Sequence, residues 1–203
     1  MDSTARIAAT LEMALRDAKL PRRTVQERRD VIGLGLDDAM LLLAPKATKE
    51  QLEQLVERYR YHWLKPEAPV TLLFEGVAEA LGTLQQQGYW LAVATGKSRT
   101  GLDRSLAECG LPEQLFVTSR CADETRGKPN PQMLEEILEE TGLQPGDAIM
   151  LGDSSYDLEM AKHAKMHSLG VLTGVHDEAR LWQQEPLAVL DSVADFPDWL
   201  LRA

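Results

Sequence analysis

Hydrophobic residues in the first third of the chain recur every three or four positions, which is the spacing of amphipathic helices. The pattern predicts four helices, over residues 4–18, 24–33, 36–44 and 48–64. In the first of them Ile7, Leu11 and Leu15 share one face. The second and fourth begin with Thr-Val-Gln-Glu and Thr-Lys-Glu-Gln, which are capping-box sequences. We therefore expect residues 1–64 to form an all-helical domain.

The pattern changes after residues 65–69 (Lys-Pro-Glu-Ala-Pro), which we interpret as a linker. Short apolar runs then predict strands at 89–94, 115–117, 148–151, 168–172 and 189–190. Helical patterns are found at 77–87, 99–109, 131–141 and 155–163, and a last helix contains Trp199. Strands that alternate with helices over short connections are typical of a doubly wound parallel sheet. Residues 70–203 are therefore predicted to form a Rossmann-like α/β core, with strands 89–94 and 148–151 buried inside it.

Composition limits the partners of this chain. Of its 203 residues, 44% are hydrophobic and 27% are charged, as in ordinary globular proteins. The net charge of −10 argues against nucleic acid or an anionic membrane as a partner, and no apolar run reaches the length of a membrane span. Cys109 and Cys121 give no disulfide framework and no metal-ligand spacing, so we expect a cytoplasmic protein. The four histidines also lack ligand spacing and are expected at the surface.

Two carboxylates follow the predicted strand 148–151. Asp153 comes directly after Gly152, and Asp157 lies in the first turn of a helix that Ser154 would cap. Both acids are thus placed at the carboxyl end of a parallel strand, where open α/β sheets bind ligands. Paired carboxylates are suitable ligands for a hard cation such as Mg²⁺. The alternative is that Asp153 only caps the helix and Asp157 is solvated, because acidic residues are common in first helical turns.

Candidate phosphate-binding groups follow two other predicted strands. Thr95, Gly96 and Lys97 come after the strand 89–94, and Lys128 lies in a Gly-Lys-Pro sequence further along. Hydroxyl and backbone N–H groups can donate to phosphate oxygens, and a lysine supplies positive charge. Alone, such a threonine is more often a turn residue, and Gly-Lys-Pro is more often a surface loop. Together with the acid pair, the ordered set indicates phosphoryl transfer, which depends mainly on positioning and charge neutralisation.

These motifs resemble those of the haloacid dehalogenase-like phosphatases, and within them the phosphoglycolate phosphatase-like branch. Residues 93–97 are similar to the second motif of that family, 127–129 to the third and 152–157 to the fourth. The resemblance implies a mobile helical cap and Mg²⁺-dependent hydrolysis of a small phosphorylated metabolite through an aspartyl-phosphate. It also implies catalytic roles for Thr95 and Lys128. The phosphoryl oxygens would be held by Thr95, Gly96, Lys97 and Lys128, and the metal ion by Asp153 and Asp157.

The first motif of the family is different in this sequence. It is an apolar strand ending in Asp-x-Asp-Gly-Thr-(Leu/Val)-x-Asp-Ser, and Met1-Asp2-Ser3 fits only its last three positions. The nucleophilic and general-acid aspartates have no counterpart, and Asp2 is expected to cap the first helix. The missing strand would lie between 89–94 and 148–151, where its five or so apolar side chains would contribute roughly 1.5–3 kcal/mol each. We therefore expect Met1 to be an internal methionine of a longer parent, and this chain alone to lack covalent turnover.

Two other functions are left open by the sequence. One is an inactive relative that binds a phosphorylated ligand or a partner protein. The other is a receiver domain, which the order of threonine, lysine and acid pair argues against. In the family that the chain resembles, the cap selects the substrate, so Arg28, Arg29, Gly33 and Gly35 are candidate substrate contacts. Their alternative interpretation is a solvated basic helix face and a helix break. We expect a monomer or weak dimer.

Overall fold

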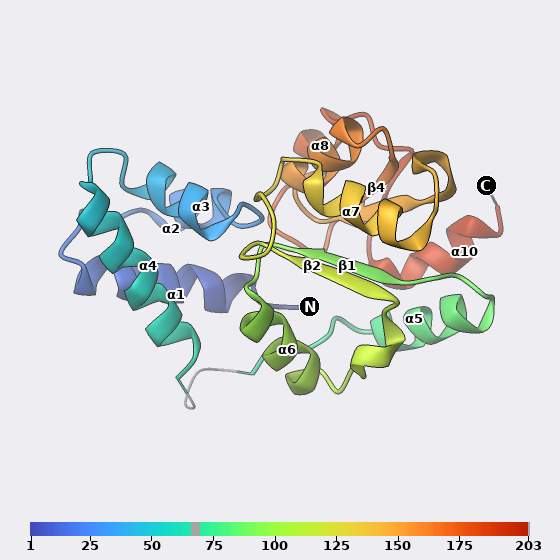
Figure 1. The fold of residues 1–203 in the computed structure, drawn as a ribbon, viewed down its shortest axis with the longest axis horizontal. Coiled ribbons are helices and arrows are strands. Elements are labelled where there is room, and N and C mark those ends of the chain that lie inside the picture. Colours follow the sequence, from blue (N-terminus) through green and yellow to red (C-terminus); the bar gives the residue numbers. More distant parts are fainter. Residues whose placement is uncertain (66–69, 203) are drawn as a thin grey trace.

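The first part of the chain folds into four helices, which we call the helical cap. The computed structural model describes residues 1–65 and 70–202, so most of the predicted linker lies outside the described residues. The helices are α1 (Thr4–Asp17), α2 (Val25–Asp30), α3 (Leu36–Leu43) and α4 (Lys49–Trp63). They lie together at one end of the molecule (Figure 1). All four predicted helices are therefore present.

Local sequence explains where the cap helices begin and what they bury. Thr24 and Thr48 each accept a hydrogen bond from the backbone N–H three residues later, and the capping boxes are complete. The predicted apolar faces of α1 and α4 pack on each other through Leu11, Leu15 and Leu55, all of which are buried. Burial of each such side chain contributes about 1.5–3 kcal/mol, which is enough to order helices this short.

The second part is an α/β core. Its strands are β1 (Ala92–Thr95), β2 (Thr118–Cys121), β3 (Ile149–Gly152), β4 (His167–Val171) and β5 (Ala188–Leu190), and all of their pairings are parallel. Its helices are α5 (Val77–Gln86), α6 (Arg99–Glu108), α7 (Gln132–Thr141), α8 (Ser155–His163), α9 (Glu178–Trp182) and α10 (Phe196–Leu200). Helices α7 and α8 lie on one side of the strands, and α5, α6 and α10 lie on the other (Figure 1). The predicted doubly wound α/β class is confirmed, with the helical cap beside it.

The strands form two separate sheets, β1–β2 and β3–β4–β5. Within the described residues no backbone pairing joins β1 to β3, so each of these strands has an open edge. We expected both strands to be buried, but Val93 and Met150 are only partly buried and Trp90 is 62% exposed. The physical reason is that no strand of the described part of the chain lies between β1 and β3. We call the gap between their facing edges the β1–β3 slot.

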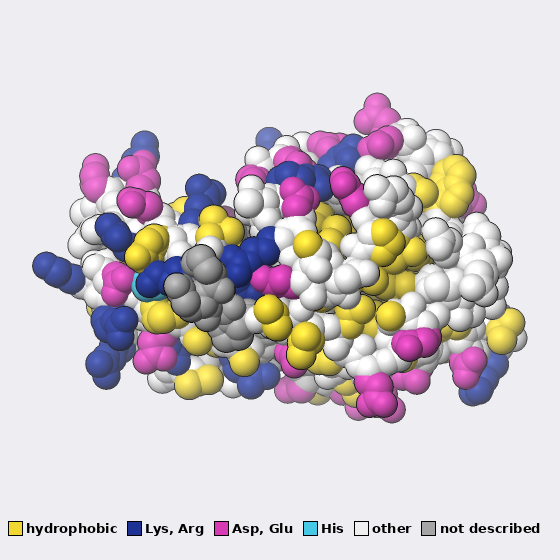
Figure 2. Space-filling model, turned by 90° about the horizontal axis from the view of Figure 1, so that it is seen from below, with side chains coloured by type: hydrophobic (Ala, Val, Ile, Leu, Met, Phe, Trp, Pro, Cys, Tyr) yellow, Lys and Arg dark blue, Asp and Glu magenta, His cyan; other side chains and the backbone are white. Residues whose placement is uncertain are grey.

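Apolar side chains also reach the surface of the core. On the face seen in Figure 2 they gather over the half of the molecule that contains the sheets, whereas Lys and Arg side chains gather over the cap. A parallel sheet that is covered on all sides would bury its apolar side chains. The exposed hydrophobic area is therefore consistent with an incompletely filled core.

One predicted strand was wrong. Residues 115–117 do not form a strand, because Glu113–Leu115 is a 3-10 turn and the strand is β2. The β2 sequence, Thr-Ser-Arg-Cys, has no apolar run, since Arg120 on it pairs with Glu136 and Glu140 of α7, each at 2.7 Å. A strand that forms ion pairs with a covering helix cannot be recognised from hydrophobicity alone.

The predicted roles of Asp2 and of two histidines were also wrong. Ser3, not Asp2, is the N-cap residue of α1, and the Asp2 backbone N–H donates to the Leu72 carbonyl at 2.7 Å. His62 and His176 are buried rather than at the surface. His62 Nε2 lies 2.7 Å from an Asp17 carboxylate oxygen, which provides the polar contact that its burial requires.

No helix in the described part of the chain combines the length and apolar character that a membrane crossing would need.

Candidate active site

The candidate site lies at the carboxyl ends of β1 and β3, beside the β1–β3 slot. A cavity of about 770 Å³ opens there, and its lining includes Thr95, Lys97, Lys128, Asp153 and Asp157. The residues predicted from three separate strand ends therefore share one cavity. These residues lie at the same edge of the sheets because the carboxyl ends of parallel strands point in the same direction.

Asp157 is held rigidly within α8. Its Oδ2 atom accepts hydrogen bonds from the Ser154 backbone N–H at 3.1 Å and from Ser154 Oγ at 2.7 Å. Its Oδ1 atom accepts a hydrogen bond from Lys128 Nζ at 2.6 Å, and both of these side chains are buried. A β-carbon at Gly152 would overlap the Asp157 side chain, so only glycine permits this approach. Asp157 and Lys128 thus form a compensated ion pair rather than two free charges.

Asp153 has a different electrostatic environment. Burial, and then the neighbouring Asp157 carboxylate, raise the pKa of Asp153 to about 6, although the Lys128 charge opposes the shift. The 173–177 loop folds over this residue, and the His176 backbone N–H approaches the Asp153 carbonyl at 3.4 Å. A carboxylate that loses hydration without gaining a direct cationic partner is stabilised when a cation binds.

The donor set fits a hard divalent cation that retains water. No group of three or more His, Cys, Asp or Glu side chains in the described ranges could enclose a metal ion. Asp153 and Asp157 provide carboxylate oxygens, and Mg²⁺ typically binds one or two carboxylates together with waters and substrate phosphate. The residues therefore fit Mg²⁺ better than a metal that requires a complete protein cage.

Thr95 and Lys97 lie on the other side of the cavity. The Thr95 hydroxyl accepts a hydrogen bond from the Lys97 backbone N–H at 3.2 Å, which holds the turn after β1. A β-carbon at Gly96 would lie 2.8 Å from the Leu34 carbonyl oxygen, so the cap loop presses directly on this turn. Burial, and then the nearby Arg6 charge, lower the pKa of Lys97 to about 8.

The structure separates the four candidate residues of the cap. Gly33 lines the cavity. Gly35 packs against Gly127 of the Lys128 loop, because a β-carbon at Gly35 would lie only 3.2 Å from the Gly127 Cα atom. Arg28 is instead buried within the cap, where it pairs with Glu12. Neither Arg28 nor Arg29 is among the residues that line the cavity. The glycine loop, not the basic helix face, is the part of the cap that reaches the candidate site.

Sequence reasoning missed the contact that holds this loop in place. Tyr156 Oη donates to the Asp30 carbonyl at 3.0 Å, and an Arg180 guanidinium nitrogen lies 3.6 Å from the Asp30 carboxylate. Tyr156 also packs against the apolar residues of the cap. We call Asp30, Tyr156 and Arg180 the cap latch. Its only sequence signal was the position of Tyr156 between the two acids of the fourth motif.

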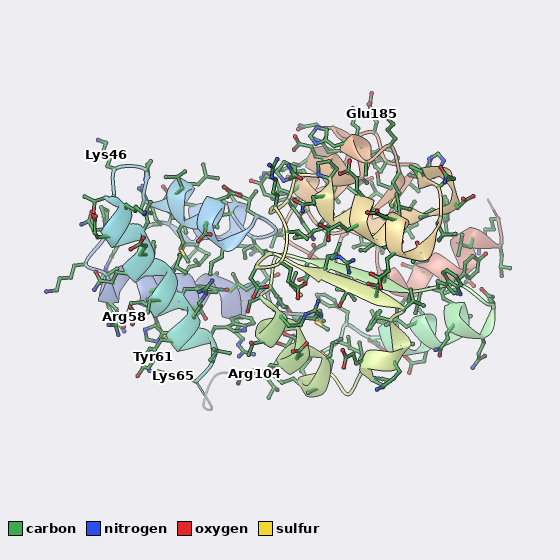
Figure 3. All side chains as sticks on the ribbon, viewed as in Figure 1. Lys46, Arg58, Tyr61, Lys65, Arg104 and Glu185 are labelled. Atoms are coloured by element: carbon green, nitrogen blue, oxygen red, sulfur yellow. The ribbon has the colours of Figure 1, made fainter. Side chains whose placement is uncertain are left out.

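The sequence also gave no indication of how cap and core are joined near Trp63. Arg6 of α1 donates to Glu108 of α6 at 3.0 Å and to the Trp63 carbonyl at 2.9 Å. Arg104 of α6 donates to Glu108 and to the Lys65 carbonyl, and Figure 3 shows Arg104 and Lys65 on either side of this junction. A buried ion pair therefore fixes the end of α4 against the core.

Comparison with known proteins places this arrangement in a family. The family model described as haloacid dehalogenase-like hydrolase matches residues 1–171. The probable phosphatase IndB of Dickeya dadantii is 32% identical over 199 residues, which cover 96% of this chain and 86% of that protein. Pyrophosphatase PpaX of Halalkalibacterium halodurans is 32% identical over 169 residues, which cover 83% of this chain and 77% of that protein. Phosphoglycolate phosphatase of Vibrio vulnificus is 29% identical over 209 residues, covering 99% and 91%.

Solved structures agree on the fold. A hydrolase from Pseudomonas syringae superposes with a TM-score of 0.89 at 22% identity, covering 99% of this chain and 92% of that one. A phosphoglycolate phosphatase from Haemophilus somnus, so named by prediction, gives a TM-score of 0.86 at 24% identity, with 98% and 92% covered. The family-model match over residues 1–171 includes both the cap and the strand ends that carry the candidate site. The chain belongs to the haloacid dehalogenase-like hydrolase family.

Proposed function

We propose that the site serves Mg²⁺-dependent hydrolysis of a small phosphate monoester, in the manner of a phosphoglycolate phosphatase. The observation that carries the proposal is the shared cavity, in which Thr95, the Lys128–Asp157 pair and Asp153 meet at the ends of two parallel strands. The names of the relatives, a phosphatase, a pyrophosphatase and a phosphoglycolate phosphatase, support the same class of reaction.

Each residue has a role that follows from its environment. The Thr95 hydroxyl and the backbone after it hold phosphoryl oxygens, and Lys128 contributes a fixed positive charge next to them. Asp153 and Asp157 hold Mg²⁺ directly or through water. When bound, Mg²⁺ supplies Lewis-acid polarisation of the phosphoryl group and neutralises its charge.

The attacking carboxylate, in this proposal, belongs to a strand that fills the β1–β3 slot. The slot lies between the turn at Thr95 and Asp153, so a strand there would bring its carboxyl end to the phosphoryl site. Two other acids that line the cavity are placed elsewhere: Asp37 lies in the first turn of α3, and Asp123 accepts a hydrogen bond from the Arg99 backbone. The open strand edges favour a second candidate function for the chain by itself, which is phosphate binding without turnover.

The test compares the 203-residue chain with a form that carries about ten added residues ahead of Met1, an apolar strand ending in Asp-x-Asp-Gly-Thr-Leu. Calorimetry with inorganic phosphate and Mg²⁺ measures binding, and p-nitrophenyl phosphate measures turnover. We expect both forms to bind phosphate and only the extended form to hydrolyse the ester. Asp153→Asn, which is nearly isosteric, should reduce turnover by orders of magnitude. Equal turnover by the two forms would place the nucleophile within residues 1–203, and no phosphate binding by either form would refute the proposed function.

A further inference from the structure

The 173–177 loop, which connects β4 to α9, lies against the start of α8. Strand β4 and helix α8 are neighbours in the core (Figure 1). His176 of this loop is 4% exposed, and its imidazole Nδ1 atom accepts a hydrogen bond from the Ser155 backbone N–H at 2.7 Å. Ser155 is the first residue of α8, so this hydrogen bond is made between Asp153 and Asp157 in the chain.

The hydrogen bond completes the N-terminus of α8. The first backbone N–H groups of an α-helix have no acceptor within the helix and need one from elsewhere. Ser154 Oγ accepts from the Asp157 N–H at 3.3 Å, and the His176 ring accepts from the Ser155 N–H. Because Asp153 directly precedes the cap residue and Asp157 lies in the first turn, the directions of both carboxylates depend on this short piece of backbone.

The same loop also contacts Asp153 directly. A β-carbon at Gly174 would overlap the Asp153 carboxylate, so the loop passes this side chain closely because residue 174 is glycine. The His176 backbone N–H approaches the Asp153 carbonyl at 3.4 Å. The loop therefore contacts Asp153 at its side chain and at its carbonyl, and it holds the turn that follows through the His176 ring.

The His176 ring is a neutral acceptor. A backbone N–H can only donate, so Nδ1 carries no proton and the ring proton is on Nε2. Within the described residues Nε2 is buried and has no hydrogen-bond partner, which costs free energy. An apolar side chain would fill the space without that cost, so packing alone does not account for a histidine here. A carboxylate could accept from Ser155 too, but it would add a third negative charge beside Asp153 and Asp157.

We propose that His176 is a positioning residue of the metal site. Its imidazole fixes the first turn of α8 in the orientation in which the carboxylates of Asp153 and Asp157 both line the cavity. His176 is not among the residues that line the cavity, so it acts through the backbone of Ser155 and not on the ion or the substrate. This inference rests on the proposed function, because it assumes that the two carboxylates hold Mg²⁺.

The experiment compares substitutions of His176 by calorimetric titration with Mg²⁺. His176→Leu fills the space of the ring but offers no acceptor, and we expect it to weaken Mg²⁺ affinity roughly tenfold to a hundredfold, as for other groups that orient a metal ligand. His176→Asn places an amide oxygen at the position of Nδ1, so it should retain most of the affinity. His176→Gln, whose amide group replaces Nε2 instead, should resemble His176→Leu and serves in its place if the leucine variant does not fold.

A second measurement reports on the hydrogen bond without the metal ion. Hydrogen exchange of the Ser155 amide in the absence of Mg²⁺ should be faster in His176→Leu and His176→Gln, and close to that of the wild type in His176→Asn. Circular dichroism and urea unfolding check that each variant is folded under the conditions of the titration.

His62 provides a matched control. Like His176 it is buried, with one ring nitrogen in a polar contact and the other without a partner in the described part of the chain. It lies in α4 of the cap, where its contact is with Asp17. His62→Leu should therefore change neither Mg²⁺ affinity nor the exchange of the Ser155 amide.

The outcomes separate this inference from the proposed function. If His176→Leu binds Mg²⁺ as tightly as the wild type, or if His176→Asn binds as weakly as His176→Leu, the inference is wrong and the proposed function stands. An equal loss of affinity in His62→Leu would attribute the effect to general destabilisation and would also overturn the inference. If the wild type binds no Mg²⁺, both the inference and the metal site of the proposed function are refuted.

Discussion

Gly33 offers a direct test of whether the cap loop is docked on the candidate site in solution. The φ angle of Gly33 is +107°, and a β-carbon there would lie 2.6 Å from Ser154 Oγ. Ser154 cannot simply rotate away, because its hydroxyl donates to Asp157 at 2.7 Å and caps α8. Gly33→Ala therefore combines backbone strain with a collision against a fixed side chain.

The expected magnitude follows from these two contributions. A β-carbon at a positive φ costs about 1–2 kcal/mol. Displacing Ser154 from its capping position adds about 1 kcal/mol, the typical value of an N-cap hydrogen bond. We expect Gly33→Ala to lower the free energy of unfolding by about 2–3 kcal/mol, or roughly 4–12 °C in Tm for a chain of this size.

Two other glycines provide matched controls for thermal and urea unfolding. Gly88 has a φ of +89° and no atom within 4 Å of a built β-carbon, so Gly88→Ala isolates the backbone strain at about 1–2 kcal/mol. Gly82 lies inside α5 with open space around it, and Gly82→Ala should stabilise by about 0.5–1 kcal/mol. Hydrogen exchange at residues 31–35 should rise only in Gly33→Ala. A Gly33→Ala cost no larger than that of Gly88→Ala would show that the loop does not rest on Ser154.

Three further predictions concern the metal site, the cap junction and the cap latch. Asp153→Ala should abolish Mg²⁺ binding in calorimetry. The Mg²⁺ affinity of the wild type should fall several-fold from pH 7 to pH 5, because a pKa of about 6 leaves the Asp153 carboxyl protonated at the lower pH. An Mg²⁺ affinity that does not change with pH would contradict this. Glu108→Gln should cost about 3 kcal/mol in urea unfolding, since it leaves the buried Arg6 unpaired. In the wild type the contribution of Glu108, whose pKa is lowered to about 2, should be complete above pH 4.5 and lost only as the pH falls toward 2, so its loss near pH 4 would be inconsistent with that ion pair. Tyr156→Phe should raise hydrogen exchange at 31–35 and change Mg²⁺ affinity less than about twofold. The control Tyr89→Phe, at an exposed tyrosine, should leave both hydrogen exchange and Mg²⁺ affinity unchanged.

The sequence by itself determined the features that depend on near neighbours in the chain. The capping boxes at Thr24 and Thr48 are satisfied between residues three positions apart, so they are visible as sequence patterns. The same is true of the Ser154 cap and of the positions of Thr95 and Asp153 after apolar strands. The α/β class and the order of the site residues followed from these local signals.

Only the tertiary structure decided which charges meet. Lys128 and Asp157 are far apart in the sequence, and their ion pair exists because α8 and the Lys128 loop pack together. Arg28 was expected at the substrate but is buried within the cap, where the exposed Glu12 carboxylate of α1 pairs with it. The 62% exposure of Trp90 likewise depends on which elements pack around it, and no property of residue 90 alone reveals it. Pairing, burial and the environment of each titratable group are set by long-range packing, which hydrophobic periodicity does not encode.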